Sequence, residues 1–149
     1  MIRRLTLACV GFALCAAGAT QLFAAGPESA AALDATDYIR TLQNTDGGFP
    51  DFGSGSSASA TLEAVFAFAA TGVDARTVQS GGQGPDDYLA SQAAAYSGSA
   101  GGAAKLVAGL AAMDIDPTLF GGVGVLAAME SNYVAATGKY GDDVFAQSL

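Results

Sequence analysis

Hydrophobic residues recur at helical spacing from about position 34 onward. One face of the first predicted helix carries Tyr38, Ile39 and Leu42. Asp34 can cap the start of this helix, and Gly47 and Gly48 follow its end, where glycine is favoured because it adopts positive φ without strain. Residues 26–33 are mostly small and include one proline, so we expect them to be a flexible lead-in.

A second predicted helix follows a loop. Residues 45–57 are rich in glycine and serine and include one proline, a composition typical of a loop. After Ser57, apolar residues recur with i, i+3, i+4, i+7 spacing at Leu62, Val65, Phe66 and Ala69. We expect this helix to end at Gly72.

The arrangement of two helices returns further along the chain. Residues 87–92 are similar to residues 37–43, and residues 111–116 are similar to residues 69–74. The equivalent residues include Tyr38 with Tyr88 and Gln43 with Gln92. Because the tyrosines share a position in the repeat, we expect them to pack within the fold.

A third unit begins at residues 125–130 and continues with residues 137–141 in the place of residues 45–49. Residues 142–149 would open its second helix, which is short, so we expect the chain to be incomplete at its C-terminus. One helix pair cannot bury its apolar face alone, so repeated pairs stack. The pattern predicts an all-α fold of stacked helix pairs over residues 34–149.

The first 25 residues have the layout of a secretory signal peptide. Arg3 and Arg4 precede an uncharged apolar run over residues 5–19, and the small residues Ala24 and Ala25 follow. The run is short for a membrane span, which needs about 20 residues, although an uncleaved anchor is the alternative. We therefore expect a secreted or cell-surface protein with no membrane span after the signal segment.

Composition and charge exclude several classes of function. The chain has 149 residues, of which 14 are acidic and 6 basic, giving a net charge of −8. Four basic residues after position 4 are too few to neutralise phosphates, so we do not expect nucleic-acid binding. The 33 alanines and 20 glycines favour closely packed helices of small residues.

The chemistry open to the chain is limited. It contains no histidine, and its two cysteines, Cys9 and Cys15, both lie in the signal segment. Typical zinc sites and Ser–His–Asp or Cys–His catalytic sets therefore cannot be assembled, and we expect no cofactor or metal. Carboxylate pairs at residues 86–87 and 142–143 could bind calcium, but we interpret them as helix starts.

The loop between the first two helices carries a family resemblance. The segment from Tyr38 to Phe49, with the small-residue helix after it, resembles the prenyltransferase and squalene-oxidase repeat of the terpenoid cyclase and protein prenyltransferase superfamily. The residues of this repeat motif, to which we assign structural roles, are Tyr38, Gln43, Asp46, Gly47, Gly48, Phe49, Gly72, Tyr88 and Gln92.

The resemblance implies an (α/α) toroid, in which helix pairs close into a ring around a cavity. The family's catalytic residues do not carry over. The string at residues 114–117, Asp-Ile-Asp-Pro, lacks the second adjacent aspartate of the cyclase motif, and Asp116 is interpreted as a cap. The zinc set of the protein-prenylating members is also missing.

Three functions follow as hypotheses. The first is an exported, non-catalytic repeat protein that binds a small hydrophobic or corrinoid-like ligand or a cell-surface partner. The second is a cyclase-like or prenyltransferase-like enzyme whose catalytic residues lie beyond Leu149. The third is a structural repeat protein of the cell surface.

Overall fold

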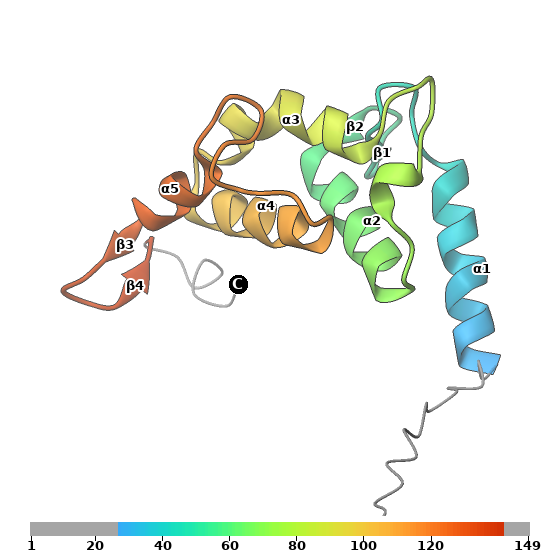
Figure 1. Cartoon of the computed structure of the whole chain (residues 1–149), viewed down its shortest axis with the longest axis horizontal. Helices are drawn as coiled ribbons and strands as arrows, with labels where there is room; N and C mark the ends of the chain where they lie inside the picture. The colour runs from blue at the N-terminus through green and yellow to red at the C-terminus, as the bar shows by residue number, and fades with distance from the viewer. Residues whose placement is uncertain (1–26, 142–149) are drawn as a thin grey trace, which may run out of the picture.

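The computed structural model describes residues 27–141, so the predicted signal peptide and the predicted helix at residues 142–149 lie outside the described residues. The described part has five α-helices and two small antiparallel sheets (Figure 1). The helices are α1 (Pro27–Thr41), α2 (Ala58–Ala70), α3 (Pro85–Tyr96), α4 (Ala100–Ala112) and α5 (Val125–Glu130), with a 3-10 turn, η1, at Ala75–Thr77. The strands are β1 (Phe49–Pro50), β2 (Ser56–Ser57), β3 (Tyr133–Val134) and β4 (Lys139–Tyr140).

From one end of the molecule to the other come α1, then α2, then α3 and α4 together, and then α5 (Figure 1). Helix α2 packs against both α3 and α4, and α4 packs against α5. Helix α1 lies at one end and the β3–β4 hairpin at the other (Figure 1). The expectation of an all-α fold is met in part, because the described residues are mainly helical but also form two small sheets. None of the helices in this part of the chain has the length and apolar character needed to cross a bilayer.

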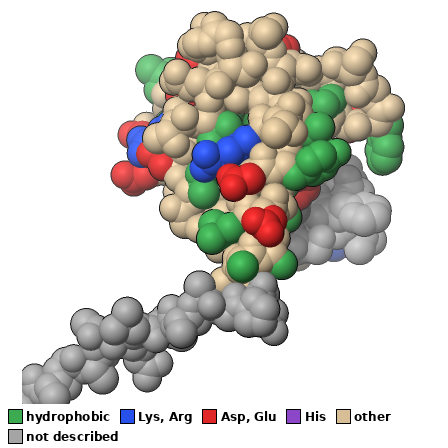
Figure 2. Space-filling view, turned by 90° about the vertical axis from the view of Figure 1, so that its right-hand side faces the viewer, with side chains coloured by type: hydrophobic (Ala, Val, Ile, Leu, Met, Phe, Trp, Pro, Cys, Tyr) green, Lys and Arg blue, Asp and Glu red, His purple; other side chains and the backbone are tan. Residues whose placement is uncertain are grey.

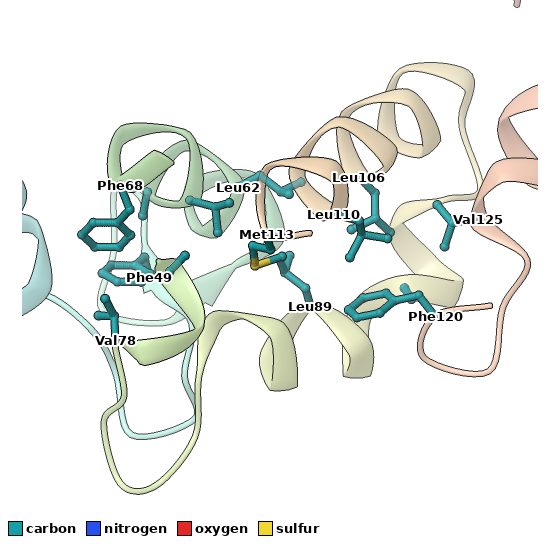
Figure 3. Close-up of a cluster of buried hydrophobic side chains, with 14 residues drawn as sticks. Phe49, Leu62, Phe68, Val78, Leu89, Leu106, Leu110, Met113, Phe120 and Val125 are labelled. Carbon is teal, nitrogen blue, oxygen red and sulfur yellow. The ribbon is translucent and has the colours of Figure 1, made fainter. Parts of the chain in front are cut away.

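One hydrophobic core runs along this arrangement (Figure 3). The side chains from α2, α3 and α4 meet at its centre, and Phe49 joins it from the loop before α2. The largest fully buried side chains are Phe68, Leu62, Leu89, Leu106, Leu110, Met113, Val65 and Val125. Burial of these side chains is the main force that holds the helices together.

The buried face of α2 differs from the predicted one. Leu62 and Val65 are buried as expected, but Phe66 is only half-buried and Ala69 is exposed, while Phe68 is completely buried. The difference arises because α2 has neighbours on more than one side. Phe68 meets the ring of Phe49, with centroids 5.9 Å apart and planes at 58°.

Helix α1 begins at Pro27 rather than at Asp34, so most of the segment 26–33 is helical and the predicted flexible lead-in is wrong there. Proline suits the first turn of a helix because its missing N–H is unpaired there in any case. Of the predicted apolar face, Ile39 is half-buried, whereas Tyr38 and Leu42 are exposed. As an end helix, α1 packs on few neighbours, which leaves part of this face uncovered.

The turns that end α2 and α4 are built alike. After α2, Gly72 has a φ of +75°, and the N–H of Val73 donates to the carbonyl of Phe68 over 2.9 Å. After α4, Asp114 occupies the equivalent position with a φ of +56°, and the N–H of Ile115 donates back into α4 over 2.9 Å. This bonding pattern is that of a Schellman motif, in which glycine is the preferred residue.

The chain continues after both turns in the same way. The Oδ1 atom of Asp74 accepts from the N–H of Arg76 over 3.0 Å, and Oδ1 of Asp116 accepts from the N–H of Thr118 over 2.9 Å. These bonds lower the pKa of both aspartates, for Asp74 chiefly through the side chain of Arg76. Each segment then reverses through a two-glycine turn closed by backbone hydrogen bonds. The interpretation of Asp116 as a cap is confirmed.

We expect the Asp114→Gly variant to be more stable than the wild type. Glycine relieves the strain of a positive φ at a helix end, which should raise the free energy of unfolding by about 0.5–1 kcal/mol. Urea denaturation followed by circular dichroism measures the change. As a control, Asp116→Ala loses the hydrogen bond to Thr118 and should lower stability. A less stable Asp114→Gly variant would contradict this explanation of the turn.

The segment after α5 does not reproduce the loop after α1. Residues 137–141 belong to the β3–β4 hairpin, where the rings of Tyr133 and Tyr140 lie 5.0 Å apart. Tyr140, the aromatic residue of this segment, is 36% exposed, whereas Phe49, the aromatic residue of the loop after α1, is 3% exposed. Residues 137–141 therefore do not pack as residues 45–49 do, and the expectation that they take the place of that loop is wrong.

Candidate ligand groove

An apolar groove of about 410 Å³ lies between α1, the β1–β2 loop and the first half of α2. We call it the α1–α2 groove. Its apolar lining consists of Ile39, Leu42, Phe49, Pro50, Phe52, Ala60 and Ala64. Its polar lining consists of Asp51, Ser59 and Glu63. Figure 2 looks onto the side of the molecule on which α1 lies and shows acidic and basic side chains interspersed with hydrophobic ones.

Hydrogen bonds fix the loop that forms one wall of the groove. Oδ1 of Asp46 accepts from the N–H of Gly48 over 3.0 Å and from the hydroxyl of Ser56 over 2.7 Å. The N–H of Phe49 donates to the buried hydroxyl of Thr61 on α2 over 2.9 Å. Asp46 therefore stabilises the turn, and Thr61 holds the backbone of Phe49 against α2 while the ring enters the core.

Gln43 connects the loop to the following segment. Its side-chain Nε2 donates to the carbonyl of Gly47 over 2.9 Å and to the carbonyl of Val78, distant in sequence, over 3.1 Å. The side chain of Gln92, its equivalent in the sequence, instead donates to the neighbouring Ser91 over 3.1 Å. The two glutamines thus share a sequence position without sharing a role.

The two glycines of the loop are required for different reasons. Gly47 has a φ of +84°, and its Cα also lies so close to the backbone carbonyl of Gly84 that a Cβ atom would clash with it. Gly48 does not have a positive φ, so that part of the expectation is wrong. A Cβ atom at Gly48 would instead clash with Ser56 and with the ring of Tyr88.

The two tyrosines at equivalent sequence positions also differ in their surroundings. Tyr38 is 65% exposed, so the expectation that it packs within the fold is wrong. Tyr88 is half-buried beneath the loop, beside Gly48. Burial raises the pKa of the Tyr88 hydroxyl, and the negative charges of Asp46 and Asp51 raise it further.

The rim of the groove carries charged groups that differ in their pairing. Lys105 reaches from α4 to the carboxylate of Glu63 over 2.5 Å and to the hydroxyl of Ser59 over 3.1 Å. The carboxylate of Asp51 accepts one hydrogen bond, from the N–H of Phe52 over 2.6 Å, and takes part in no ion pair within residues 27–141. The Phe52 side chain is fully exposed at the mouth of the groove.

Of the two aspartate pairs that could have bound a metal, the pair at residues 142–143 lies outside the described residues, and the pair at residues 86–87 has a structural position. Asp86 and Asp87 lie in the first turn of α3, and Oδ2 of Asp87 accepts from the N–H of Gly84 over 2.9 Å. This arrangement supports their interpretation as a helix start. Among the residues that the structure describes, no three histidine, cysteine, aspartate or glutamate side chains gather closely enough to hold a metal ion.

Sequence reasoning did not identify the residues at the mouth and rim of the groove. Phe52 next to Asp51, in a loop otherwise rich in glycine and serine, was a usable signal, because a large apolar residue is unusual in such a loop. Lys105 gave no such signal, since its contact with Glu63 depends on the packing of α4 against α2.

The chain matches no protein-family model, no curated protein and no solved structure.

Proposed function

We propose that this chain is a non-catalytic binding module that takes a small hydrophobic ligand into the α1–α2 groove. The groove itself carries the proposal: its volume of about 410 Å³ and its mainly apolar lining suit a small molecule. Binding sites for small molecules are typically concave, mostly apolar and about 300–1,000 Å³ in volume. A few polar groups at the rim would orient the ligand.

The composition of the chain supports a binding role over a catalytic one. It has no histidine, and its cysteines belong to the first 25 residues. The imidazole and thiol groups that often serve as general bases and nucleophiles are thus missing around the groove. The remaining hypotheses are a cyclase-like enzyme and a structural protein of the cell surface.

We also propose that the helix pairs are part of an (α/α) toroid of the terpenoid cyclase type. The supporting observations are the matching turns after α2 and α4 and the packing of these two second helices on each other. Neighbouring second helices are what an inner ring requires. A corrinoid-like ligand or a cell-surface partner remains a variant of the proposal.

Export through the N-terminal segment is a further part of the proposal. The charged start and apolar run of residues 1–25 support it. Expression in a bacterial host with N-terminal sequencing of the exported protein tests it. A product that begins near residue 26 would support export, and retention of the intact chain in the cytoplasm would refute it.

We expect Ala60→Phe to block the groove. Ala60 is a half-buried lining residue of α2, and a phenyl ring there would fill the space that a ligand needs. Fluorescence titration with Nile red, a neutral apolar dye, should show affinity at least about tenfold weaker than the wild type. Ala108→Phe, the same change at an exposed position of α4, is the matched control and should leave binding unchanged. Absence of saturable binding to the wild type would refute the proposed function.

A further inference from the structure

We propose that the α1–α2 groove selects organic cations, in which a positively charged ammonium or guanidinium group is attached to an apolar body, and that Asp51 and Phe52 bind the charged group. This inference rests on the proposed function and adds the chemical class of the ligand. Three observations carry it: the pairing of charges at the rim, the exposed aromatic ring at the mouth and the apolar floor.

The rim has one acidic group available to a ligand. The charge of Glu63 is compensated by Lys105, whose side chain is 18% exposed and is held by both Glu63 and Ser59. The carboxylate of Asp51 has no ion-pair partner within residues 27–141 and accepts a hydrogen bond from the adjacent backbone N–H of Phe52. The charge at the groove is therefore negative and concentrated at Asp51.

The aromatic ring beside this carboxylate fits the same ligand chemistry. Phe52 is fully exposed, although burial of a phenyl ring is normally favourable. The face of an aromatic ring attracts cations, and an ammonium or guanidinium group also pairs with a carboxylate. Adjacent positions in the chain, both lining the groove, allow Asp51 and Phe52 to act on one charged group.

The floor of the groove accounts for the apolar part of the ligand. It is lined by Ile39 of α1, by Leu42 directly after that helix, by Ala60 and Ala64 of α2 and by the buried Phe49. None of these side chains can form a hydrogen bond, so the ligand portion that lies there is apolar. The net charge of −8 would further attract cations and repel anions at low ionic strength.

A pair of ligands of equal shape tests the inference. 4-Phenylbutyltrimethylammonium carries the cation, and its carbon isostere with a tert-butyl group is neutral. Competition against Nile red on the purified chain at low ionic strength should give about tenfold tighter binding of the cation. The preference should shrink in high salt, because exposed charges are screened.

Substitutions at Asp51 and Phe52 test whether these residues cause the preference for the cation. Asp51→Asn should bring the two ligands to within about twofold of each other. Phe52→Leu keeps an apolar side chain and should reduce the preference about threefold. Asp34→Asn, which removes the same charge from an exposed position of α1 outside the lining, is the matched control and should keep the full preference.

The outcomes separate this inference from the proposed function. Equal affinity for both ligands in the wild type, or a preference that survives Asp51→Asn, would overturn the choice of cations while leaving the hydrophobic groove intact. Failure of both ligands with retained Nile red binding would also overturn it. Failure of all three compounds would refute the proposed function as well.

Discussion

Replacement of Phe68 by alanine is expected to lower the free energy of unfolding by about 3–5 kcal/mol, the range for truncation of a buried phenylalanine. The side chain is completely buried on α2 and meets the ring of Phe49 at 5.9 Å. Its removal would leave a cavity where the loop and α2 join the core. Urea denaturation followed by circular dichroism measures the loss, and Phe68→Leu offers a milder variant if Phe68→Ala does not fold.

Phe66→Ala is the matched control for this experiment. It makes the same change two residues away on the same helix, at a half-buried position, and should cost no more than about 2 kcal/mol. If Phe66→Ala proved as damaging as Phe68→Ala, the helical face predicted from the sequence would be right and the packing described for α2 would be wrong.

Gly47→Ala is expected to destabilise the protein by about 2–4 kcal/mol, for two separate reasons. The residue has a φ of +84°, which strains any side chain, and a Cβ atom would clash with the carbonyl of Gly84. That carbonyl belongs to the backbone and cannot rotate away as a flexible side chain would. The loop would have to move away from the start of α3, and the Gln43 hydrogen bonds would be strained with it.

Gly72→Ala separates the two causes. Gly72 has a φ of +75°, but a Cβ atom there would meet nothing within 4 Å. The same substitution should therefore cost only about 1 kcal/mol, from backbone strain alone. Thermal or urea denaturation of both variants gives the comparison, and equal losses would show that the contact between Gly47 and Gly84 is unimportant.

The sequence predicted the local structure of the chain better than its packing. The loop over residues 45–57 and the helix between Ser57 and Gly72 follow from composition and capping, which act within a few residues. The buried face of α2 could not be predicted in the same way, because Phe68 and Phe66 are equally hydrophobic. Which of them is buried depends on where α3, α4 and Phe49 lie.

The sequence predicted structural roles for several residues of the loop beside the groove, but not the groove itself. Gln43, Asp46 and Gly47 do have structural roles, but the bond from Gln43 to Val78 and the close approach of Gly47 to Gly84 join residues that are distant in sequence. The similarity between residues 37–43 and 87–92 suggested equal environments, yet Tyr38 is exposed and Tyr88 half-buried. Sequence similarity does not show how many neighbours a helix has, and α1 is an end helix whereas α3 lies between neighbours.

The α1–α2 connection is longer than the α3–α4 connection, and the two therefore differ in how much sequence change they can accept. Between α3 and α4 the chain turns within residues 97–99, whereas between α1 and α2 it uses residues 42–57 and forms the strand pair. The short connection leaves little room for variation without disturbing α4. The long one can change exposed residues such as Asp51 and Phe52 without rebuilding the core, because Phe49 and Thr61 keep it attached to α2.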